Sequence, residues 1–237
     1  MSEKIIALVP AAGIGARARR QSKAAILKPD LPKQYELLHG LPMLRLSTMA
    51  MLADSRIQQV RVIVSPTDTR AEGVLVGLDK TICRPVGGET RADTVYNALV
   101  DLQPTADMWV VVHDAARPGL PADALERLIS TCLEHNQGGI LATPVPDTLK
   151  RAQAGTQPLQ IEQTVPRDQL WLAQTPQMFK ATQLLHALEL VREQQLSITD
   201  EASAIEQLGI QPLLVRGAVE NFKITWPEDF SILERLL

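Results

Sequence analysis

The stretch that decides the fold is residues 5–15, which read Ile5-Ile-Ala-Leu-Val-Pro-Ala-Ala-Gly-Ile-Gly15. Its first five residues are all aliphatic, as in a parallel strand that helices cover on both faces. The small residues that follow let the backbone approach a ligand, and successive N–H groups can cradle a phosphate. A tight turn without a ligand is the rival interpretation. The loop is not a Walker A loop, because no Gly-Lys-Ser/Thr follows, and Ala18 breaks the GxGxxG dinucleotide pattern.

Short aliphatic runs alternate with helical patterns along the rest of the chain. Further strands are predicted at 60–64, 81–84, 109–112, 139–143 and 213–215, and helices at 42–53, 91–102, 122–134, 181–194, 201–208 and 227–236. This alternation predicts a doubly wound α/β fold with a mostly parallel sheet and right-handed crossovers. Capping boxes are expected at Ser197-x-x-Asp200 and Thr225-x-x-Glu228, before the last two helices.

The polar segment 147–165 interrupts this alternation. Apolar residues recur at alternating positions within it, and a turn at 153–157 lies in its middle. We interpret residues 147–168 as a β-hairpin arm. Because two isolated strands are marginal in water, an arm that joins two copies of the chain is the preferred interpretation, with a flexible loop as the alternative. No repeat or clean linker divides the rest, so residues 1–237 are predicted to form a single domain that contains the arm.

Composition excludes several classes of function. The 237 residues carry 24 basic and 27 acidic side chains, so the net charge of −3 gives no argument for a nucleic-acid or membrane partner. Aromatic residues make up only 3%, too few for a base-stacking surface. No run approaches the ~20 apolar residues of a membrane helix. Pro10 and Gly13 break the only stretch that resembles a signal sequence. These two observations predict a cytoplasmic protein. Cys83 and Cys132 form no CxxC motif and are expected to be reduced thiols.

Ligands of doubly wound sheets bind beyond the carboxyl ends of the strands. Asp114 follows a predicted strand, where its carboxylate could hold Mg²⁺ beside a polyphosphate, and Arg117 could bind phosphate oxygens. His113 is interpreted as a packed or hydrogen-bonded residue rather than a catalyst. The segment Gly87-Gly-Glu-Thr-Arg-Ala-Asp-Thr94 opens a helix whose free N–H groups can face a ligand. A cluster of cations suggests a lid over a polyphosphate, with a solvated loop as the alternative: Arg17, Arg19, Arg20, Lys23, Lys28 and Lys33.

Eight motifs follow one another in order over nearly the whole chain. They are Pro10-Ala-Ala-Gly-x-Gly15, Pro32-Lys-Gln-Tyr35, Gly87-Gly-x-x-Arg-Ala-Asp-Thr94, His113-Asp-Ala-Ala-Arg-Pro118, Asp147-Thr-Leu-Lys150, Thr175-Pro-Gln177, Thr199-Asp-Glu-Ala-Ser203 and Asn221-Phe-Lys-Ile-Thr225. Together they resemble the 2-C-methyl-D-erythritol 4-phosphate cytidylyltransferase family of non-mevalonate isoprenoid biosynthesis. The resemblance implies a Rossmann-like nucleotidyltransferase, a homodimer joined by the arm, and transfer of CMP from CTP to methylerythritol phosphate with Mg²⁺ and release of pyrophosphate.

The resemblance also implies roles for individual residues. Three cations are expected to act on the phosphates: Arg17, Lys33 and Lys223. The nucleotide is expected to contact Ala11, Ala12, Gly13, Gly15, Gly88, Glu89, Thr94, Asp114 and Ala115, with Asp114 also holding Mg²⁺. Methylerythritol phosphate is expected to contact Arg117, Thr148, Arg167, Thr175 and Thr199, two of which flank the arm, so that each pocket would be shared between subunits.

Departures and rivals accompany this resemblance. The stretch between Gly15 and Pro32 is longer than the family pattern, and Thr94 replaces an expected serine. A ribitol-5-phosphate cytidylyltransferase is the nearest rival, but it should carry a serine and a different small residue after the aspartate. A nucleotide-binding module without transferase chemistry is the rival from another class, and the broken dinucleotide motif disfavours it.

Overall fold

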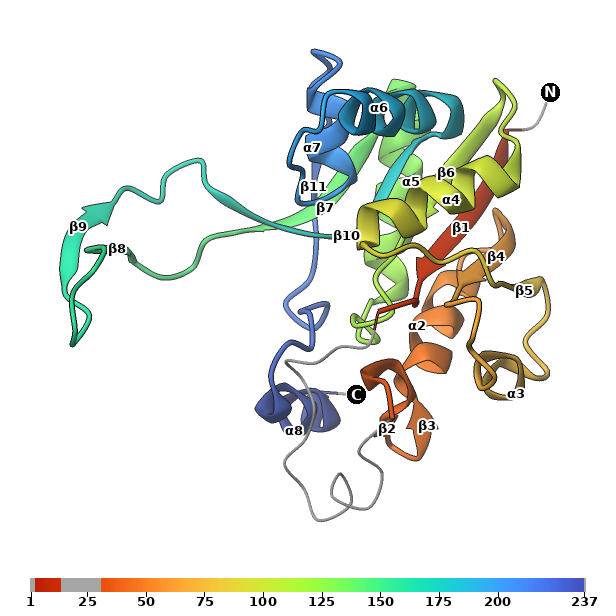
Figure 1. Cartoon of the computed structure of the whole chain (residues 1–237), viewed down its shortest axis with the longest axis horizontal. Coiled ribbons are helices and arrows are strands. Elements are labelled where there is room, and N and C mark those ends of the chain that lie inside the picture. The colour runs from red at the N-terminus through yellow and green to blue at the C-terminus, as the bar shows by residue number, and fades with distance from the viewer. Residues whose placement is uncertain (1–2, 14–30, 237) are drawn as a thin grey trace.

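The computed structural model describes residues 3–13 and 31–236. The part of the chain that it describes contains a seven-stranded main sheet in the order β11-β7-β10-β6-β1-β4-β5 (Figure 1). Its strands are β1 (Lys4–Pro10), β4 (Ile57–Ile63), β5 (Thr81–Arg84), β6 (Met108–Val112), β7 (Gly139–Pro144), β10 (Trp171–Lys180) and β11 (Leu213–Arg216). β10 runs antiparallel to both of its neighbours, and the other pairs are parallel. The predicted doubly wound, mostly parallel α/β fold is thus confirmed.

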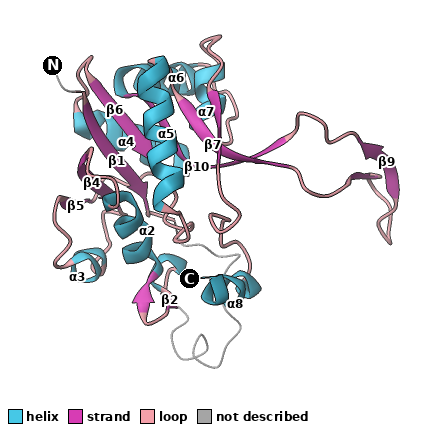
Figure 2. Cartoon of the chain, turned by 180° about the vertical axis from the view of Figure 1, so that it is seen from behind, coloured by secondary structure: helices cyan, strands magenta, loops and turns pink. Residues whose placement is uncertain are grey.

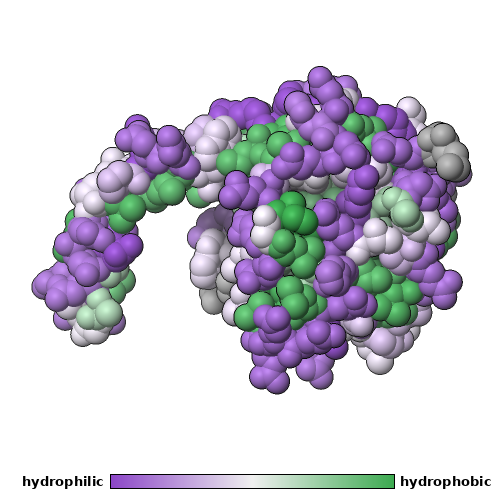
Figure 3. All heavy atoms as spheres, turned by 90° about the horizontal axis from the view of Figure 1, so that it is seen from above, coloured by the Kyte–Doolittle hydropathy of each residue, from purple (hydrophilic) through white to green (hydrophobic). Residues whose placement is uncertain are grey.

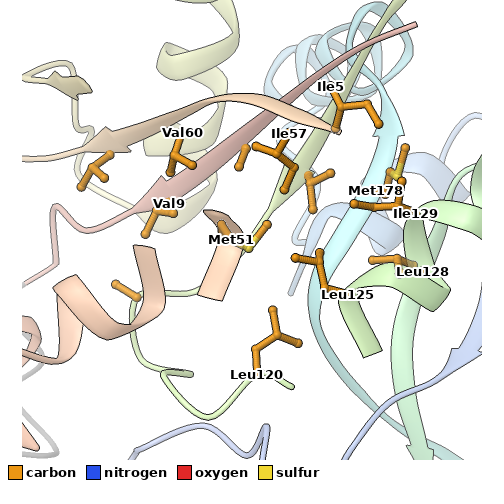
Figure 4. Packing of buried hydrophobic residues seen from close by; sticks show 14 of the residues in the cluster. Ile5, Val9, Met51, Ile57, Val60, Leu120, Leu125, Leu128, Ile129 and Met178 are labelled. Carbon is orange, nitrogen blue, oxygen red and sulfur yellow. The ribbon is translucent and has the colours of Figure 1, made fainter. Parts of the chain in front are cut away.

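Helices cover both faces of this sheet. They are α2 (Met43–Leu52), α3 (Ala71–Leu75), α4 (Arg91–Leu102), α5 (Ala122–His135), α6 (Ala181–Glu193) and α7 (Glu201–Glu206), whereas α8 (Pro227–Leu236) lies away from the main sheet. Because side chains alternate along a strand, Val9 of β1 belongs to the core on the side of α2 and α5, whereas Leu8 belongs to the core on the side of α4, α6 and α7. Figure 2 shows α5 on one face, and Figure 4 shows Val9, Met51 and Leu125 meeting in its core. The continuous aliphatic run of β1 reflects burial on both sides.

The order of the strands places a topological switch point beside β1. The chain runs from β1 outward through β4 to β5, and then returns to place β6 on the other side of β1. The connections after β1 and β6 therefore leave the sheet in opposite directions, which opens a crevice at the carboxyl ends of these two strands. The residues that follow each strand, Ala11 and His113, begin the two segments that border this crevice.

Two predicted helix caps are wrong. The side chain of Asp200 accepts from the N–H of Ser203, and the hydroxyl of Ser203 accepts from the N–H of Asp200, so the box before α7 begins three residues after Ser197. Before α8, the carboxylate of Asp229 accepts from the N–H of Thr225, so a residue inside the helix makes the cap. In both places an aspartate carboxylate, a stronger acceptor than a hydroxyl, accepts from a backbone N–H at the start of the helix.

The predicted hairpin is present and projects from the body of the molecule (Figure 1). It consists of β8 (Leu149–Ala152) and β9 (Ile161–Val165), which pair only with each other, and the ends of β7 and β10 lead into it. Leu159 and Ile161 are 73% and 64% exposed on it. Figure 3 shows apolar side chains along the arm, which a single chain leaves uncovered.

A second two-stranded sheet, β2 (Leu37–Leu38) with β3 (Leu41–Pro42), lies beside α8 and was not predicted. It follows the 3₁₀ turn η2 (Lys33–Tyr35) and packs with α8 in a small separate core. Both cysteines are unpaired, as expected from their spacing. Within residues 3–13 and 31–236, no helix has the length and apolar character needed to cross a membrane.

Candidate active site

A pocket opens at the switch point, where the carboxyl ends of β1 and β6 diverge. The loop after β1, the turn η2, the loop before α4, the residues after β6 and the segment after β11 line its walls. It brings together ten of the residues that the sequence placed in the site: Ala11, Ala12, Gly13, Lys33, Gly88, Glu89, Thr94, Asp114, Ala115 and Lys223. Five chain segments thus converge where the topology predicts a ligand.

The walls of this pocket are built by close approach of backbone. A Cβ atom at Gly87 would lie 2.4 Å from the Cβ of Ala12 and 2.7 Å from the carbonyl oxygen of Val64, so only glycine fits there. The hydroxyl of Thr94 accepts from the N–H of Gly88 at 3.1 Å and donates to the carbonyl of Thr90 at 2.9 Å. The methyl and hydroxyl of Thr94 are buried, so this side chain shapes the loop that faces the ligand.

The turn η2 holds Lys33 over the pocket through its neighbours. Gln34 donates from Nε2 to the carbonyl of Ala11 at 2.8 Å, and Tyr35 donates from its hydroxyl to Asp68 at 2.5 Å. Burial, together with this bond to Asp68, holds the pKa of Tyr35 well above its usual value, so the hydroxyl stays a donor. Lys33 donates from Nζ to the carbonyl of Ile224 at 2.7 Å, which brings it next to the segment that carries Lys223.

Asp114 is the centre of the charged groups in the pocket. Its carboxylate accepts from Arg91 Nε and from Lys223 Nζ, each at 2.7 Å. Arg91 also donates from both terminal nitrogens to Glu201, at 2.7 and 2.9 Å. Burial alone would raise the pKa of Asp114, but the charges of Arg91 and Lys223 outweigh burial and hold that pKa well below its usual value. The carboxylate is therefore ionised at neutral pH.

A hydrogen bond to Thr175, which also contacts His113, holds the backbone of Asp114 in place. The hydroxyl of Thr175 accepts from the N–H of Asp114 at 2.9 Å and also contacts Nδ1 of His113 at 3.2 Å. The other ring nitrogen of His113 lies 2.9 Å from the carbonyl of Arg117. His113 is fully buried, and burial lowers its pKa to about 4, so it is neutral at pH 7. His113 is thus a packed, hydrogen-bonded residue, as the sequence indicated.

Several other predicted site residues lie outside this pocket. Arg117 donates to the carbonyls of Asn221 at 2.7 Å and of Ala173 at 3.4 Å, so it ties the segment after β11 to β10. Thr148 and Arg167 are exposed at the base of the arm, where Arg167 donates to the carbonyl of Pro146. Thr199 is exposed and lines a neighbouring hollow that shares two residues, Thr90 and Arg91, with the pocket. Gly15 and Arg17 lie outside the described residues.

The sequence analysis missed two charged residues that the structure places here, Arg91 and Glu201. Each stands inside a matched motif, but neither received a role. They are 110 positions apart, and Glu201 is only 2% exposed. The sequence did offer a signal: Arg91 and Glu201 carry opposite charges, and each is the first residue of a predicted helix within a matched motif.

A crevice between the ends of β1 and β6 that collects two lysines and an ionised aspartate beside a small-residue loop suits a nucleoside triphosphate. These features place the protein among the nucleotidyltransferases with a Rossmann-like core. Comparison with known proteins makes the assignment specific: the sequence model of the 2-C-methyl-D-erythritol 4-phosphate cytidylyltransferase family matches residues 5–237. The chain belongs to this family, as the eight motifs indicated.

Relatives and solved structures agree with this membership. A protein of this name from Bordetella pertussis is 56% identical over 237 residues and covers 100% of both chains. One from Laribacter hongkongensis is 46% identical over 235 residues, covering 99% of this chain and 96% of the relative. A crystal structure of 4-diphosphocytidyl-2C-methyl-D-erythritol synthase has a TM-score of 0.83 at 39% identity, covering 100% of this chain and 99% of the other. The Francisella tularensis family member has a TM-score of 0.79 at 33% identity, covering 99% and 100%.

Proposed function

We propose that the protein transfers CMP from CTP to 2-C-methyl-D-erythritol 4-phosphate and releases pyrophosphate. A phosphate oxygen of the sugar forms a new bond to the α-phosphorus, and the bond from the α-phosphorus to the bridging oxygen of pyrophosphate breaks. The attacking phosphate is already anionic at pH 7, so no side-chain nucleophile is required. The observation that carries the proposal is the convergence of Lys33, Lys223 and Asp114 on the small-residue loop of β1.

Lys33 and Lys223 are proposed to stabilise the negative charge that develops around the α-phosphorus. Their segments are joined by the bond from Lys33 to the carbonyl of Ile224, so both amines belong to one wall of the pocket. Fixed positive groups of this kind act through positioning and charge stabilisation, the main source of catalysis in phosphoryl transfer. Arg17 is proposed as a third cation on the phosphates.

The small residues are proposed to bind the nucleotide through backbone atoms. Ala11, Ala12, Gly13 and Gly15 would surround the phosphates and ribose, and Ala115 would border the same nucleotide. Gly88, Glu89 and Thr94 are proposed to border cytosine, whose 4-amino group is a donor where uracil has an acceptor. A buried mismatch of this kind leaves polar groups unpaired, which is costly.

We also propose that Mg²⁺ binds together with CTP at Asp114. Each oxygen of this carboxylate already accepts a bond from one cation and keeps a further lone pair. Within the described ranges, no three His, Cys, Asp or Glu side chains form a metal-binding group. The donors therefore fit an ion held by one carboxylate, substrate phosphates and water, as is usual for Mg²⁺. Bound there, the ion would neutralise phosphate charge.

The arm is proposed to join two subunits into a homodimer and to complete the pocket for the sugar phosphate. Thr148 and Arg167 lie at the base of the arm and are exposed in one chain, as is Thr199 near the pocket. Together with Arg117 and Thr175, these residues are proposed to bind methylerythritol phosphate. A cytoplasmic location is part of the same proposal, because CTP is a metabolite of that compartment.

Pyrophosphate release tests the reaction. CTP with methylerythritol phosphate should be the preferred pair over UTP or ribitol 5-phosphate, and preference for ribitol 5-phosphate would refute the substrate assignment. Lys33→Ala and Lys223→Ala should each lower kcat by roughly 10². Lys4→Ala is the control, since Lys4 is exposed at the other end of β1. Asp114→Asn should raise the Mg²⁺ concentration needed for half-maximal rate, and an unchanged requirement contradicts the metal assignment.

Light scattering during gel filtration tests the arm. Changing both Leu159 and Ile161 to lysine should produce a monomer, because these exposed apolar side chains would then carry charge into the interface. Val76→Lys is the matched control, since Val76 is 72% exposed on the body of the molecule. A dimer that persists in the arm variant excludes the proposed contact.

A further inference from the structure

Glu201 is a buried carboxylate that the proposed reaction does not use. It is the first residue of α7 and is 2% exposed. Both of its oxygens are occupied by one side chain, the guanidinium of Arg91, at 2.7 and 2.9 Å. A buried charge is retained only when it is paired and hydrogen-bonded, so the question is what this pair does at the edge of the pocket.

Arg91 connects Glu201 to the pocket through its third nitrogen. Nε donates to one oxygen of Asp114 at 2.7 Å, and the other oxygen of Asp114 accepts from Lys223 at 2.7 Å. The four side chains form one row of ion pairs with alternating charge, which we name the charge line: Glu201, Arg91, Asp114 and Lys223. It runs from α7, through the start of α4 and the end of β6, to the segment after β11.

The geometry of arginine makes this line directional. A guanidinium is planar, and two parallel bonds to one carboxylate fix its plane. With its two terminal nitrogens held by Glu201, Arg91 can point Nε in only one direction, which is toward Asp114. The backbone of Asp114 is fixed separately by Thr175. Glu201 therefore determines the direction from which the Asp114 carboxylate is held.

The charges of the line also balance. Two carboxylates face two cations, so Arg91 is neutralised mainly by Glu201 and Asp114 remains available to Lys223. With Glu201 neutral, Arg91 would have Asp114 as its single anionic partner and would compete with Lys223 for both oxygens. Lys223 would then lose the contact that fixes its amine in the pocket.

We propose that Glu201 is a positioning residue for nucleotidyl transfer, acting through Arg91 to hold Asp114 and Lys223 in place. This inference rests on the proposed roles of Asp114 and Lys223 in the reaction. The competing explanation is that the Glu201–Arg91 pair only fastens α7 to α4. The two explanations differ in what they predict for kcat, because a fastening role affects stability alone.

The experiment compares Glu201→Gln with Asp101→Asn in steady-state pyrophosphate release and thermal unfolding. Asp101 is a matched control, since it is 16% exposed in its side chain and pairs with two arginines, Arg61 and Arg84, outside the pocket. Glu201→Gln should lower kcat at least about tenfold with KM for CTP changed less than about threefold, since small displacements of catalytic groups are costly. Asp101→Asn should leave kcat unchanged.

Two conservative variants keep the test decisive if Glu201→Gln unfolds. Glu201→Asp keeps the charge and should recover part of kcat, whereas Arg91→Lys keeps the charge but loses the fork and should lower kcat as Glu201→Gln does. Equal losses of melting temperature in Glu201→Gln and Asp101→Asn, with kcat unchanged in both, would overturn the inference. Lys223→Ala in the same assay separates this inference from the proposed function. A lower kcat in Lys223→Ala leaves the proposed function intact, and an unchanged kcat contradicts the proposed role of Lys223 itself.

Discussion

Replacing Gly87 with alanine should damage both stability and nucleotide binding. The added Cβ would stand 2.4 Å from the Cβ of Ala12 and 2.7 Å from the carbonyl oxygen of Val64. Carbon atoms pack at about 3.5–4.0 Å, so the loop before α4 must move by roughly 1 Å away from the end of β1. Overpacking of this kind costs about 1–3 kcal/mol.

The expected losses can be measured in two assays. At about 2–4 °C per kcal/mol for a chain of this size, the melting temperature should fall by roughly 2–12 °C. A displacement of about 1 Å at a binding wall can reduce the rate by up to about 10²-fold. In the pyrophosphate-release assay, kcat/KM for CTP should therefore fall by about 10–100-fold.

Two control variants separate this clash from a general effect of adding a methyl group. Gly73→Ala adds a Cβ in α3 that meets nothing within 4 Å, and it should leave kcat/KM unchanged while stabilising the helix by about 0.5–1 kcal/mol. Ala12→Gly removes one of the two clashing atoms, so the double variant with Gly87→Ala should recover at least about 0.5 kcal/mol of the loss. If Gly87→Ala unfolds at the wild-type temperature and binds CTP normally, the close approach has no energetic importance.

Three further predictions address single side chains. Thr94→Val leaves the N–H of Gly88 without its acceptor and should raise KM for CTP roughly five- to tenfold, whereas Thr94→Ser should not; equal KM values for the two variants would speak against it. The bond from Arg56 lowers the pKa of Asp54 below its unfolded value, so this stabilisation is complete above about pH 4 and is lost as the pH falls toward the folded pKa. Asp54→Asn should therefore lower the free energy of urea unfolding by about 1 kcal/mol at pH 7, a modest value because the Arg56 side chain is 34% exposed to solvent. The loss should be clearly smaller at pH 3, and an equal loss at both pH values would exclude this pairing. Cys132 is fully buried and burial raises its pKa to about 12, so it should react with a thiol reagent at pH 8 only after unfolding, and rapid labelling of the folded protein would contradict this.

The core of the fold could be predicted because its information is local. The aliphatic run of β1 indicated burial on both faces, and the rule for doubly wound sheets then placed the ligand beside the residues that follow β1 and β6. Both inferences need only the pattern within one segment and a general constraint on topology. The pocket residues Ala11 and Asp114 follow from them.

Strand β10 was missed because its stability depends on distant partners. It is an interior strand, antiparallel to both of its neighbours, yet it contains the polar residues Gln174 and Gln177. Gln177 is 1% exposed and satisfied by Asp200 at 2.8 Å and by the N–H of Ala202 at 2.9 Å. Gln174 donates to the carbonyl of Ala218 at 2.8 Å. A buried amide is stable only where such partners exist, and a pattern within one segment does not show them.

The charged residues of the site divide in the same way. Asp114 stands just after a strand that the pattern identifies, so its place could be inferred, whereas Lys33 lies in the unpredicted turn η2 and was assigned through its motif. Arg91 and Glu201 are brought together by the packing of α4 against α6 and of α6 against α7. Their pairing is therefore a property of the assembled fold.

Part of the pocket is lined by residues that carry no side chain or a single methyl group, among them Ala11, Gly13 and Gly88. A compound that derives its affinity from amide groups of the main chain would contact atoms that every amino acid except proline possesses. Point substitutions could weaken it only by adding bulk, and at Gly87 added bulk collides with the protein itself. Inhibitors directed at this surface should therefore leave the enzyme few routes to drug resistance that preserve its own reaction.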